Sequence, residues 1–427
     1  MVLFLPTVLW AGTPYFYGTT NKNPLSYQLG EEIIFSVHLL EDGQELCGKV
    51  LKWQCYGDDG YKKEGEIVSD QNPLTIKATL TQPGFVHLKV NAFEPDGTAL
   101  PILPFQGSAG ADWQSMKNVE EPDDFDSFWN QQKERLNNVP MQAELVPVDV
   151  PEDQDHLYYD VKINCVGAPV SGYYRKPKNA QPKSLPIRIA FIGYNYHSAF
   201  LPVWGNNALA VDPTVPLSWA EDSDRLKDGL IFNINAHGYE NGKSAEYYEK
   251  FAQGPGKNYG FIKEENENRE TSYFLGILLR AIRLLQWLKE QPEWDGQTIV
   301  VAGGSQGGFQ ALAAAGLDSE VSECYAFIPW LCNLGGHEEQ GYFPSSFCPE
   351  YTKALRYFDA ANHAKRIQGK VMIVSGLGDF VCPPGSQAIL YNCISSPKKI
   401  EFRQGMQHPE EMANAEVFFF SKDWSIP

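Results

Sequence analysis

The sequence predicts an α/β protein in which a mostly parallel sheet, covered by helices on both faces, follows a smaller all-β segment. Two observations predict this order. Residues 15–108 contain short runs in which apolar and polar side chains alternate, the pattern of strands with one buried face. Beyond residue 122, strand-like runs alternate with helical runs. These later strands are apolar almost throughout, as in strands that are buried on both faces.

The first segment is predicted to form a small β-sandwich. Residues 33–39 and 74–80 place apolar side chains at every second position, and residues 86–90 repeat the pattern after the turn sequence Gln82-Pro83-Gly84. Short strands that are separated by Asp-Gly and Pro-Gly turns favour a sandwich of immunoglobulin-like size.

Residues 1–112 are therefore expected to form an N-terminal β-sandwich domain, and residues 113–427 a second, larger domain. At the start of the first domain, residues 1–12 are apolar and resemble the end of a secretory signal peptide, although no Lys or Arg precedes them. The same run is equally compatible with an ordinary first strand. A secreted or periplasmic location is expected if it is a signal remnant, and a cytoplasmic location is not excluded.

Composition excludes several classes of function. The net charge of −18 at pH 7 repels nucleic acid and anionic membrane surfaces. No run approaches the ~18 consecutive apolar residues that a membrane-spanning helix needs. The eight cysteines form no C-x-x-C pair and so indicate neither zinc nor redox chemistry, although Cys332 with Cys348, or Cys47 with Cys55, could be bridged in an exported protein.

The second domain is predicted to alternate strands and helices. Strands are expected at residues 187–192, 230–234, 298–302, 325–328, 371–375 and 399–402, and helices at residues 271–289 and 306–315. Another helix is expected after Asp123-Asp124, because carboxylates favour the first turn of a helix. Helix 271–289 repeats apolar residues at i, i+3 and i+4, which predicts one buried stripe.

The sequence Gly303-Gly304-Ser305-Gln306-Gly307 is the strongest functional motif. It matches G-x-S-x-G and lies directly between a predicted strand and an Ala-rich helix, as a nucleophile elbow requires. Glycines are needed there because the tight turn strains the backbone of the serine and neighbouring elements pass close to it. The motif predicts the α/β-hydrolase fold, with Ser305 as the nucleophile.

Two further residues complete a catalytic triad in the chain order that this fold requires, serine, then acid, then histidine. Asp379 follows strand 371–375, and His408 follows strand 399–402. Both loops leave the carboxyl ends of their strands, the same end at which Ser305 lies. We therefore predict that His408 is the general base and that Asp379 orients it.

Other candidates surround this triad. The oxyanion hole is predicted to combine the backbone N–H of Gln306 with that of Tyr194, which follows strand 187–192. His237, Tyr196 and Trp330 are candidates for binding substrate, and a structural hydrogen-bonding role for His237 is equally compatible. No metal ligand set is predicted, because His337-Glu338-Glu339 lacks the second histidine of H-E-x-x-H.

These motifs resemble the acetyl xylan esterase and cephalosporin C deacetylase family, the seventh family of carbohydrate esterases. The resemblance runs from Pro122 to the C-terminus. It is carried by the segments Pro122-Asp123-Asp124-Phe125-Asp126-Ser127-Phe128-Trp129, Gly193-Tyr194-Asn195, Gly303-Gly304-Ser305-Gln306-Gly307-Gly308, Gly376-Leu377-Gly378-Asp379 with Cys382-Pro383-Pro384, and His408. Two segments depart from the family pattern. They are Asn235-Ala236-His237-Gly238-Tyr239-Glu240-Asn241-Gly242, where the family usually has Arg-Gly-Gln, and His408-Pro409-Glu410, where it has His-Glu.

The resemblance implies a serine esterase that removes acetyl groups from acetylated xylan, oligosaccharides or similar small acetyl esters, with no metal or organic cofactor. An acetylated saccharide is then the expected partner, and a homo-oligomer is compatible, as in some relatives. A broader carboxylesterase, a serine peptidase on the same fold and a non-catalytic glycan-binding protein are the alternatives. The N-terminal domain supplies none of the triad and is expected to orient substrate or subunits, so that its removal leaves small-ester hydrolysis within roughly tenfold.

Overall fold

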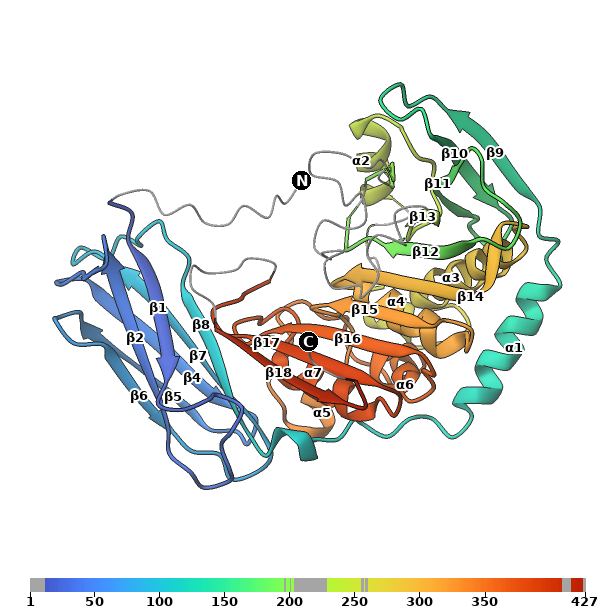
Figure 1. Ribbon diagram of the computed structural model, residues 1–427. Coiled ribbons are helices and arrows are strands. Elements are labelled where there is room, and N and C mark those ends of the chain that lie inside the picture. Colours follow the sequence, from blue (N-terminus) through green and yellow to red (C-terminus); the bar gives the residue numbers. More distant parts are fainter. Residues whose placement is uncertain are drawn as a thin grey trace.

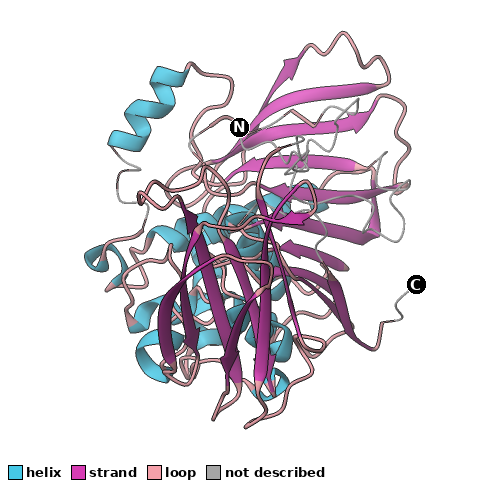
Figure 2. Ribbon diagram, turned by 90° about the vertical axis from the view of Figure 1, so that its left-hand side faces the viewer, coloured by secondary structure: helices cyan, strands magenta, loops and turns pink. Residues whose placement is uncertain are grey.

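The computed structural model describes residues 12–195, 197–199, 201–202, 229–254, 257, 260–408 and 416–424. The predicted signal-peptide remnant, except for Gly12, and Tyr196 lie outside these residues. Figure 1 shows two β-rich parts side by side, an N-terminal part drawn mostly in blue and a larger α/β part drawn mostly from green to red. Figure 2 views the molecule from the side of the N-terminal strands, which lie in front of the large sheet and its helices.

The N-terminal part contains two four-stranded sheets in which every strand pairing is antiparallel. One sheet pairs β2 with β1, β3 and β6, and the other has the order β5-β4-β7-β8. The strands are β1 (Tyr15–Thr20), β2 (Ile33–Glu41), β3 (Gln44–Glu45), β4 (Val50–Gly57), β5 (Lys62–Val68), β6 (Leu74–Ala78), β7 (Gly84–Phe93) and β8 (Phe105–Ala111).

The predicted alternation explains how these two sheets are joined. Strand β2 buries every second side chain, and β6 does the same. Phe35 and Ile76 from the first sheet lie in one apolar cluster with Val86 and Leu88 from the second. Burial of apolar surface between the sheets therefore holds the N-terminal part together.

The larger part is built on a ten-stranded sheet of order β18-β17-β16-β15-β14-β12-β13-β11-β10-β9. Its middle strands, from β13 through β17, pair in parallel, and strands at both ends pair antiparallel. The strands are β9 (Ala143–Val148), β10 (His156–Ile163), β11 (Val170–Pro177), β12 (Leu185–Phe191), β13 (Leu230–Asn235), β14 (Trp294–Gly304), β15 (Glu323–Phe327), β16 (Lys370–Gly376), β17 (Lys398–Arg403) and β18 (Val417–Lys422). The parallel strands confirm the predicted order of elements, and the antiparallel extension β9–β11 was not predicted.

Helices lie between these strands in the chain. The α-helices are α1 (Phe125–Asn137), α2 (Ala245–Gln253), α3 (Tyr273–Lys289), α4 (Gln306–Leu317), α5 (Gly336–Gln340), α6 (Ala360–Ala364) and α7 (Pro384–Cys393). Short 3-10 helices occur at Trp113–Ser115, Lys263–Asn266 and Lys353–Tyr357. In the described part of the chain, no helix combines the length and the apolar character needed to cross a bilayer.

The central strands are buried on both faces, as their apolar sequences predicted. In β14, Ile299 and Val301 join the large cluster that includes helices α3 and α4, whereas Val300 and Ala302 join a smaller cluster on the opposite face. Because parallel strands end at the same edge of a sheet, the loops after β12, β14, β16 and β17 open at one edge. All the predicted catalytic residues lie in or directly after these loops.

Candidate active site

Ser305 occupies a strained turn between β14 and α4. Its backbone has φ 52° and ψ −117°, a combination that L-residues rarely adopt. Two hydrogen bonds hold this turn, because the Ser305 N–H donates to the carbonyl of Phe327 at 2.9 Å and the Ser305 carbonyl accepts from the N–H of Trp330 at 3.0 Å. The geometry is that of a nucleophile elbow, with the serine at the N-terminus of a helix.

The glycines of the motif are needed for close packing behind the serine. A Cβ on Gly307 would lie 2.0 Å from the carbonyl oxygen of Phe191, and a Cβ on Gly303 would lie 2.4 Å from the carbonyl carbon of Gly307. Both distances are far shorter than van der Waals contact. The end of β12, the end of β14 and the first turn of α4 therefore meet with no room for a side chain.

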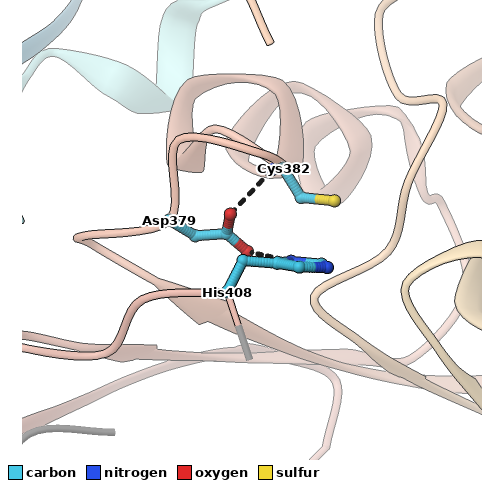
Figure 3. Close-up of side chains that lie close together, drawn as sticks. All are labelled: Asp379, Cys382 and His408. Carbon is cyan, nitrogen blue, oxygen red and sulfur yellow. Dashed lines mark hydrogen bonds and ion pairs between the residues drawn. The ribbon is translucent and has the colours of Figure 1, made fainter. Parts of the chain in front are cut away.

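Asp379 and His408 are brought together by the loops after β16 and β17. The Nδ1 atom of His408 donates to Oδ2 of Asp379 at 2.8 Å (Figure 3). The other carboxylate oxygen accepts the backbone N–H groups of Val381 at 2.9 Å and Cys382 at 2.7 Å. Asp379 is completely buried, and its hydrogen bond places the proton of neutral His408 on Nδ1, so that Nε2 is free to accept one.

Cys382 is a neighbour of the triad that sequence reasoning did not assign to the site. Its thiol is buried, which is the main reason that its pKa lies well above the usual value, and the charge of Asp379 raises the pKa further. A hydrogen bond with Ser305 lowers the pKa of the thiol and offsets part of this rise. The segment Cys382-Pro383-Pro384 was noticed only as part of a family resemblance, since a single cysteine in a loop carries no local signal.

The described residues show no hydrogen bond between the Ser305 hydroxyl and His408. Such contacts are often long before substrate binds and tighten in the substrate complex. Ser305, Asp379 and His408 follow the ends of three parallel strands of one sheet, β14, β16 and β17, and the contact between serine and imidazole has to form when substrate arrives.

The two predicted oxyanion donors lie on elements that touch each other. Gln306 is the first residue of α4, and the N-terminal end of a helix dipole favours a negative charge. Tyr194 lies in the loop that follows β12, and β12 contacts the first turn of α4 through Phe191 and Gly307. Within that loop, the side-chain amide of Asn195 donates to the carbonyl of Gly193 at 2.8 Å.

His237 anchors this loop and is held away from solvent. Its Nε2 lies 2.9 Å from the carbonyl oxygen of Asn195, and its Nδ1 lies 2.6 Å from the hydroxyl of Tyr273. Since a carbonyl only accepts, Nε2 carries the proton and Nδ1 accepts from the tyrosine. Burial lowers the pKa of His237 to about 3, so the ring is neutral at physiological pH. These contacts favour the structural role over direct binding of substrate.

Trp330 belongs to an aromatic wall beside the elbow. Its indole N–H donates to the carbonyl of Phe347 at 2.6 Å, and the two rings stack with centroids 5.6 Å apart. Phe261 contacts both rings, and Tyr194 meets Phe347 edge to face at 5.3 Å. Trp330 itself is only 2% exposed, so it supports this wall more than it offers a surface for substrate.

A cavity of about 230 Å³ lies next to the elbow and the acid loop. Trp330, Cys332, Cys348 and Cys382 are among its lining residues. All eight cysteines of the chain are free, so neither of the two pairings that an exported protein would allow is formed.

The N-terminal part packs directly on the loops of the predicted acid and base. A Cβ on Gly378, the residue before Asp379, would lie 2.3 Å from the carbonyl oxygen of Gln106. The side-chain amide of Gln407, the residue before His408, donates to the carbonyl of Pro104 at 2.6 Å. Both catalytic loops therefore touch the segment Pro104–Gln106 at the start of β8.

A second contact reaches the loop that carries Phe347. The N–H of Phe343 donates to the buried carboxylate of Asp58 at 2.7 Å. The ring of His87 stacks on Phe343 at 4.2 Å and meets Phe380, the residue after Asp379, edge to face at 5.8 Å. The N-terminal part contributes no nucleophile, acid or base of the triad, but it contacts the loops that carry the predicted acid and base.

The family model described as acetyl xylan esterase (AXE1) matches residues 113–337 and 348–424. Acetyl esterase Axe7A of Xylanibacter ruminicola is 26% identical over 348 residues, which cover 79% of this chain and 72% of that protein.

Two solved structures share the fold of the larger part. The acetyl xylan esterase from Paenibacillus sp. R4 has a TM-score of 0.52 at 25% identity and covers 69% of this chain and 93% of its own. Acetyl xylan esterase 1 from Thermoanaerobacterium sp. JW/SL YS485 has a TM-score of 0.53 at 24% identity and covers 71% of this chain and 93% of its own. The larger part of the chain is therefore of the α/β-hydrolase type.

We predict that His237→Gln slows modification of Ser305 by a fluorophosphonate about tenfold, which corresponds to a rise of about 1.4 kcal/mol in the activation free energy. The substitution removes a neutral anchor of the loop that carries Tyr194. Because the pKa of His237 is about 3, the pH dependence of labelling between pH 5 and 8 should keep its wild-type midpoint. Labelling rates across this range measure both effects, and a midpoint that moves or disappears would show that His237 titrates in the reaction.

Proposed function

Because the chain belongs to the acetyl xylan esterase family and is a carboxylic ester hydrolase, we propose that it removes acetyl groups from acetylated saccharides through an acetyl–Ser305 intermediate. The observation that carries this proposal is the hydrogen bond of 2.8 Å between His408 and the buried Asp379, on loops that open at the same edge of the sheet as Ser305. An esterase of this kind needs no metal or organic cofactor.

In the first half of the proposed reaction, Nε2 of His408 takes the proton of the Ser305 hydroxyl while Oγ attacks the acetyl carbonyl carbon. The carbonyl electrons move to oxygen, and the resulting oxyanion accepts hydrogen bonds from the backbone N–H groups of Gln306 and Tyr194. The C–O bond to the sugar then breaks, and the imidazolium gives its proton to the leaving alkoxide. The saccharide departs with a free hydroxyl.

In the second half, His408 takes a proton from water, and the hydroxide oxygen attacks the acetyl carbon of the intermediate. The oxyanion uses the same two N–H groups. Collapse breaks the bond to Oγ of Ser305, which recovers its proton from His408, and acetate leaves. Asp379 stabilises the imidazolium in both halves, and its second oxygen is held in place by the N–H groups of Val381 and Cys382.

The proposed substrate is a neutral acetylated saccharide. The net charge of −18 disfavours polyanionic partners and has no such effect on an uncharged sugar ester. The aromatic wall of Trp330, Phe261 and Phe347 beside the elbow offers apolar surface to an acyl or sugar group, with Phe347 the exposed member.

We also infer that residues 1–112 form a separate domain with an immunoglobulin-like sandwich and that it holds the catalytic loops in place. The start of the family match at residue 113 supports this boundary, and the apolar cluster shared by the two N-terminal sheets supports the sandwich. The contacts of Pro104 with Gln407, and of Gln106 with Gly378, support the positioning role.

We predict that Ser305→Ala and His408→Ala each lower acetate release from acetylated xylo-oligosaccharides by about 10³-fold or more, and that Asp379→Ala lowers it somewhat less. The double variant of Ser305 and His408 should be no worse than either single variant, because the two residues act as a unit. Acetate release by the purified proteins, with a peptide amide as comparison substrate, measures the losses and the reaction class.

The same assay separates the alternatives. A wild-type protein that cleaves the peptide amide faster than the acetyl ester would be a peptidase on this fold. If His408→Ala kept wild-type turnover, the assignment of the base would be wrong. A protein with neither activity and no reaction of Ser305 with a fluorophosphonate would be a binding protein.

We predict that Gln407→Ala lowers kcat for a small acetyl ester about tenfold with little change in KM, since it loosens the support of the His408 loop. Asp58→Asn should lower kcat and also raise KM, since the loop that Asp58 holds carries Phe347. Gln54→Ala, an exposed glutamine of β4, is the matched control and should leave both constants unchanged. Steady-state kinetics and melting temperatures of the three variants distinguish loss of positioning from loss of folded protein. Unchanged kcat in both test variants would show that the N-terminal domain does not position the catalytic loops.

A further inference from the structure

We propose that a thiophilic divalent cation of the Zn²⁺ class binds between Cys382 and His408 and reversibly blocks the nucleophile. Asp379, Cys382 and His408 each offer one ligand atom, and these atoms all lie within 4.8 Å of one another. Figure 3 shows the sulfur of Cys382 and the outer nitrogen of the His408 ring extending to the same side of Asp379. Sulfur and imidazole nitrogen at this spacing are the donors that Zn²⁺ prefers.

His408 already has the arrangement that zinc-binding histidines need. Its Nδ1 donates to Asp379 at 2.8 Å, which leaves the lone pair of Nε2 pointing away from the carboxylate. A histidine backed by a carboxylate in this way is the usual partner of a bound zinc ion. Both oxygens of Asp379 are engaged, one by His408 and the other by the N–H groups of Val381 and Cys382. We therefore assign Asp379 as the residue that orients His408 and not as a direct ligand.

The Ser305 hydroxyl and a water molecule are the proposed third and fourth ligands of the ion. Ser305 is the hydrogen-bonding neighbour of the Cys382 thiol, so its hydroxyl is available as an oxygen ligand beside the sulfur. Water can take the fourth position, as it does in zinc sites that have three protein ligands. Cys382 and His408, with the Ser305 hydroxyl and one water, would complete the four ligands that Zn²⁺ prefers.

Binding exchanges one proton for one bond to the metal. The ion forms a bond to Cys382 Sγ, the thiol proton passes to the solvent buffer, and His408 Nε2 donates its lone pair. Hard cations such as Mg²⁺ prefer oxygen ligands and do not displace a thiol proton, so they should not compete. With Nε2 occupied, His408 no longer accepts the proton of Ser305. This loss of activity rests on the esterase function proposed above, whereas binding of the ion does not.

The test is calorimetric titration of Zn²⁺ into the metal-free full-length protein, with Co²⁺ absorption in the thiolate charge-transfer region as a second readout. We expect one ion per chain at this site. In Cys382→Ser, binding should weaken at least tenfold and the Co²⁺ band should be lost. Cys47→Ser, a change at an exposed cysteine of the N-terminal domain, should bind like the wild type. Ester hydrolysis is measured in parallel, with inhibition expressed as a fraction of each variant's own activity and reversed by a chelator.

Outcomes separate the two proposals. Equal affinity in Cys382→Ser and the wild type would overturn the site, as would a loss of binding in Cys348→Ser alone, since Cys348 lines the same cavity without joining the cluster. An active enzyme that binds no Zn²⁺ through Cys382 also overturns it. If Zn²⁺ binds through Cys382 and His408 but no ester is hydrolysed, the metal site stands and only the proposed function fails.

Discussion

The close approach of three backbone segments behind Ser305 is the constraint on which the rest of the site depends. A single Cβ on Gly307 would lie 2.0 Å from the carbonyl oxygen of Phe191, so the end of β12 and the first turn of α4 are in direct backbone contact. This contact forces the chain to turn at Ser305 with φ 52°, a conformation that costs about 1–3 kcal/mol. The hydrogen bonds to Phe327 and from Trp330 offset that strain. The same contact sets the loop of Tyr194 next to the N-terminus of α4.

A second constraint comes from the N-terminal part of the chain. The acid and base loops are not held by the large sheet alone, because Gly378 contacts Gln106 and Gln407 donates to Pro104. The start of β8 and the residue before it thus contact both loops at the residues directly before Asp379 and His408. Asp379 and His408 must lie within hydrogen-bond distance of each other and His408 must reach Ser305. Their positions therefore depend partly on N-terminal residues that take no part in the chemistry.

The sequence was sufficient to predict what depends on local pattern and chain order. The G-x-S-x-G turn between a strand and a helix located Ser305, and the order of strands located Asp379 and His408. Contacts between distant segments were not predictable in this way. Nothing in the local sequence of Pro104 points to Gln407, and a cysteine in a loop gives no sign that its thiol will lie beside Ser305. His237 follows a strand at the active edge like a substrate-binding residue, but its hydrogen bonds to Tyr273 and Asn195 are tertiary contacts.

The presence of Cys382 beside Ser305 makes the identity of the acylated atom the most direct test of the account. Intact-protein and peptide mass spectrometry of the enzyme, quenched with acid during turnover of an acetyl ester, would locate any covalent acetyl group. The account predicts acetylation of the peptide that contains Ser305, with the peptide that contains Cys382 unmodified. Acetyl on Cys382, or continued turnover in Ser305→Ala, would contradict the assignment of Ser305 as the nucleophile.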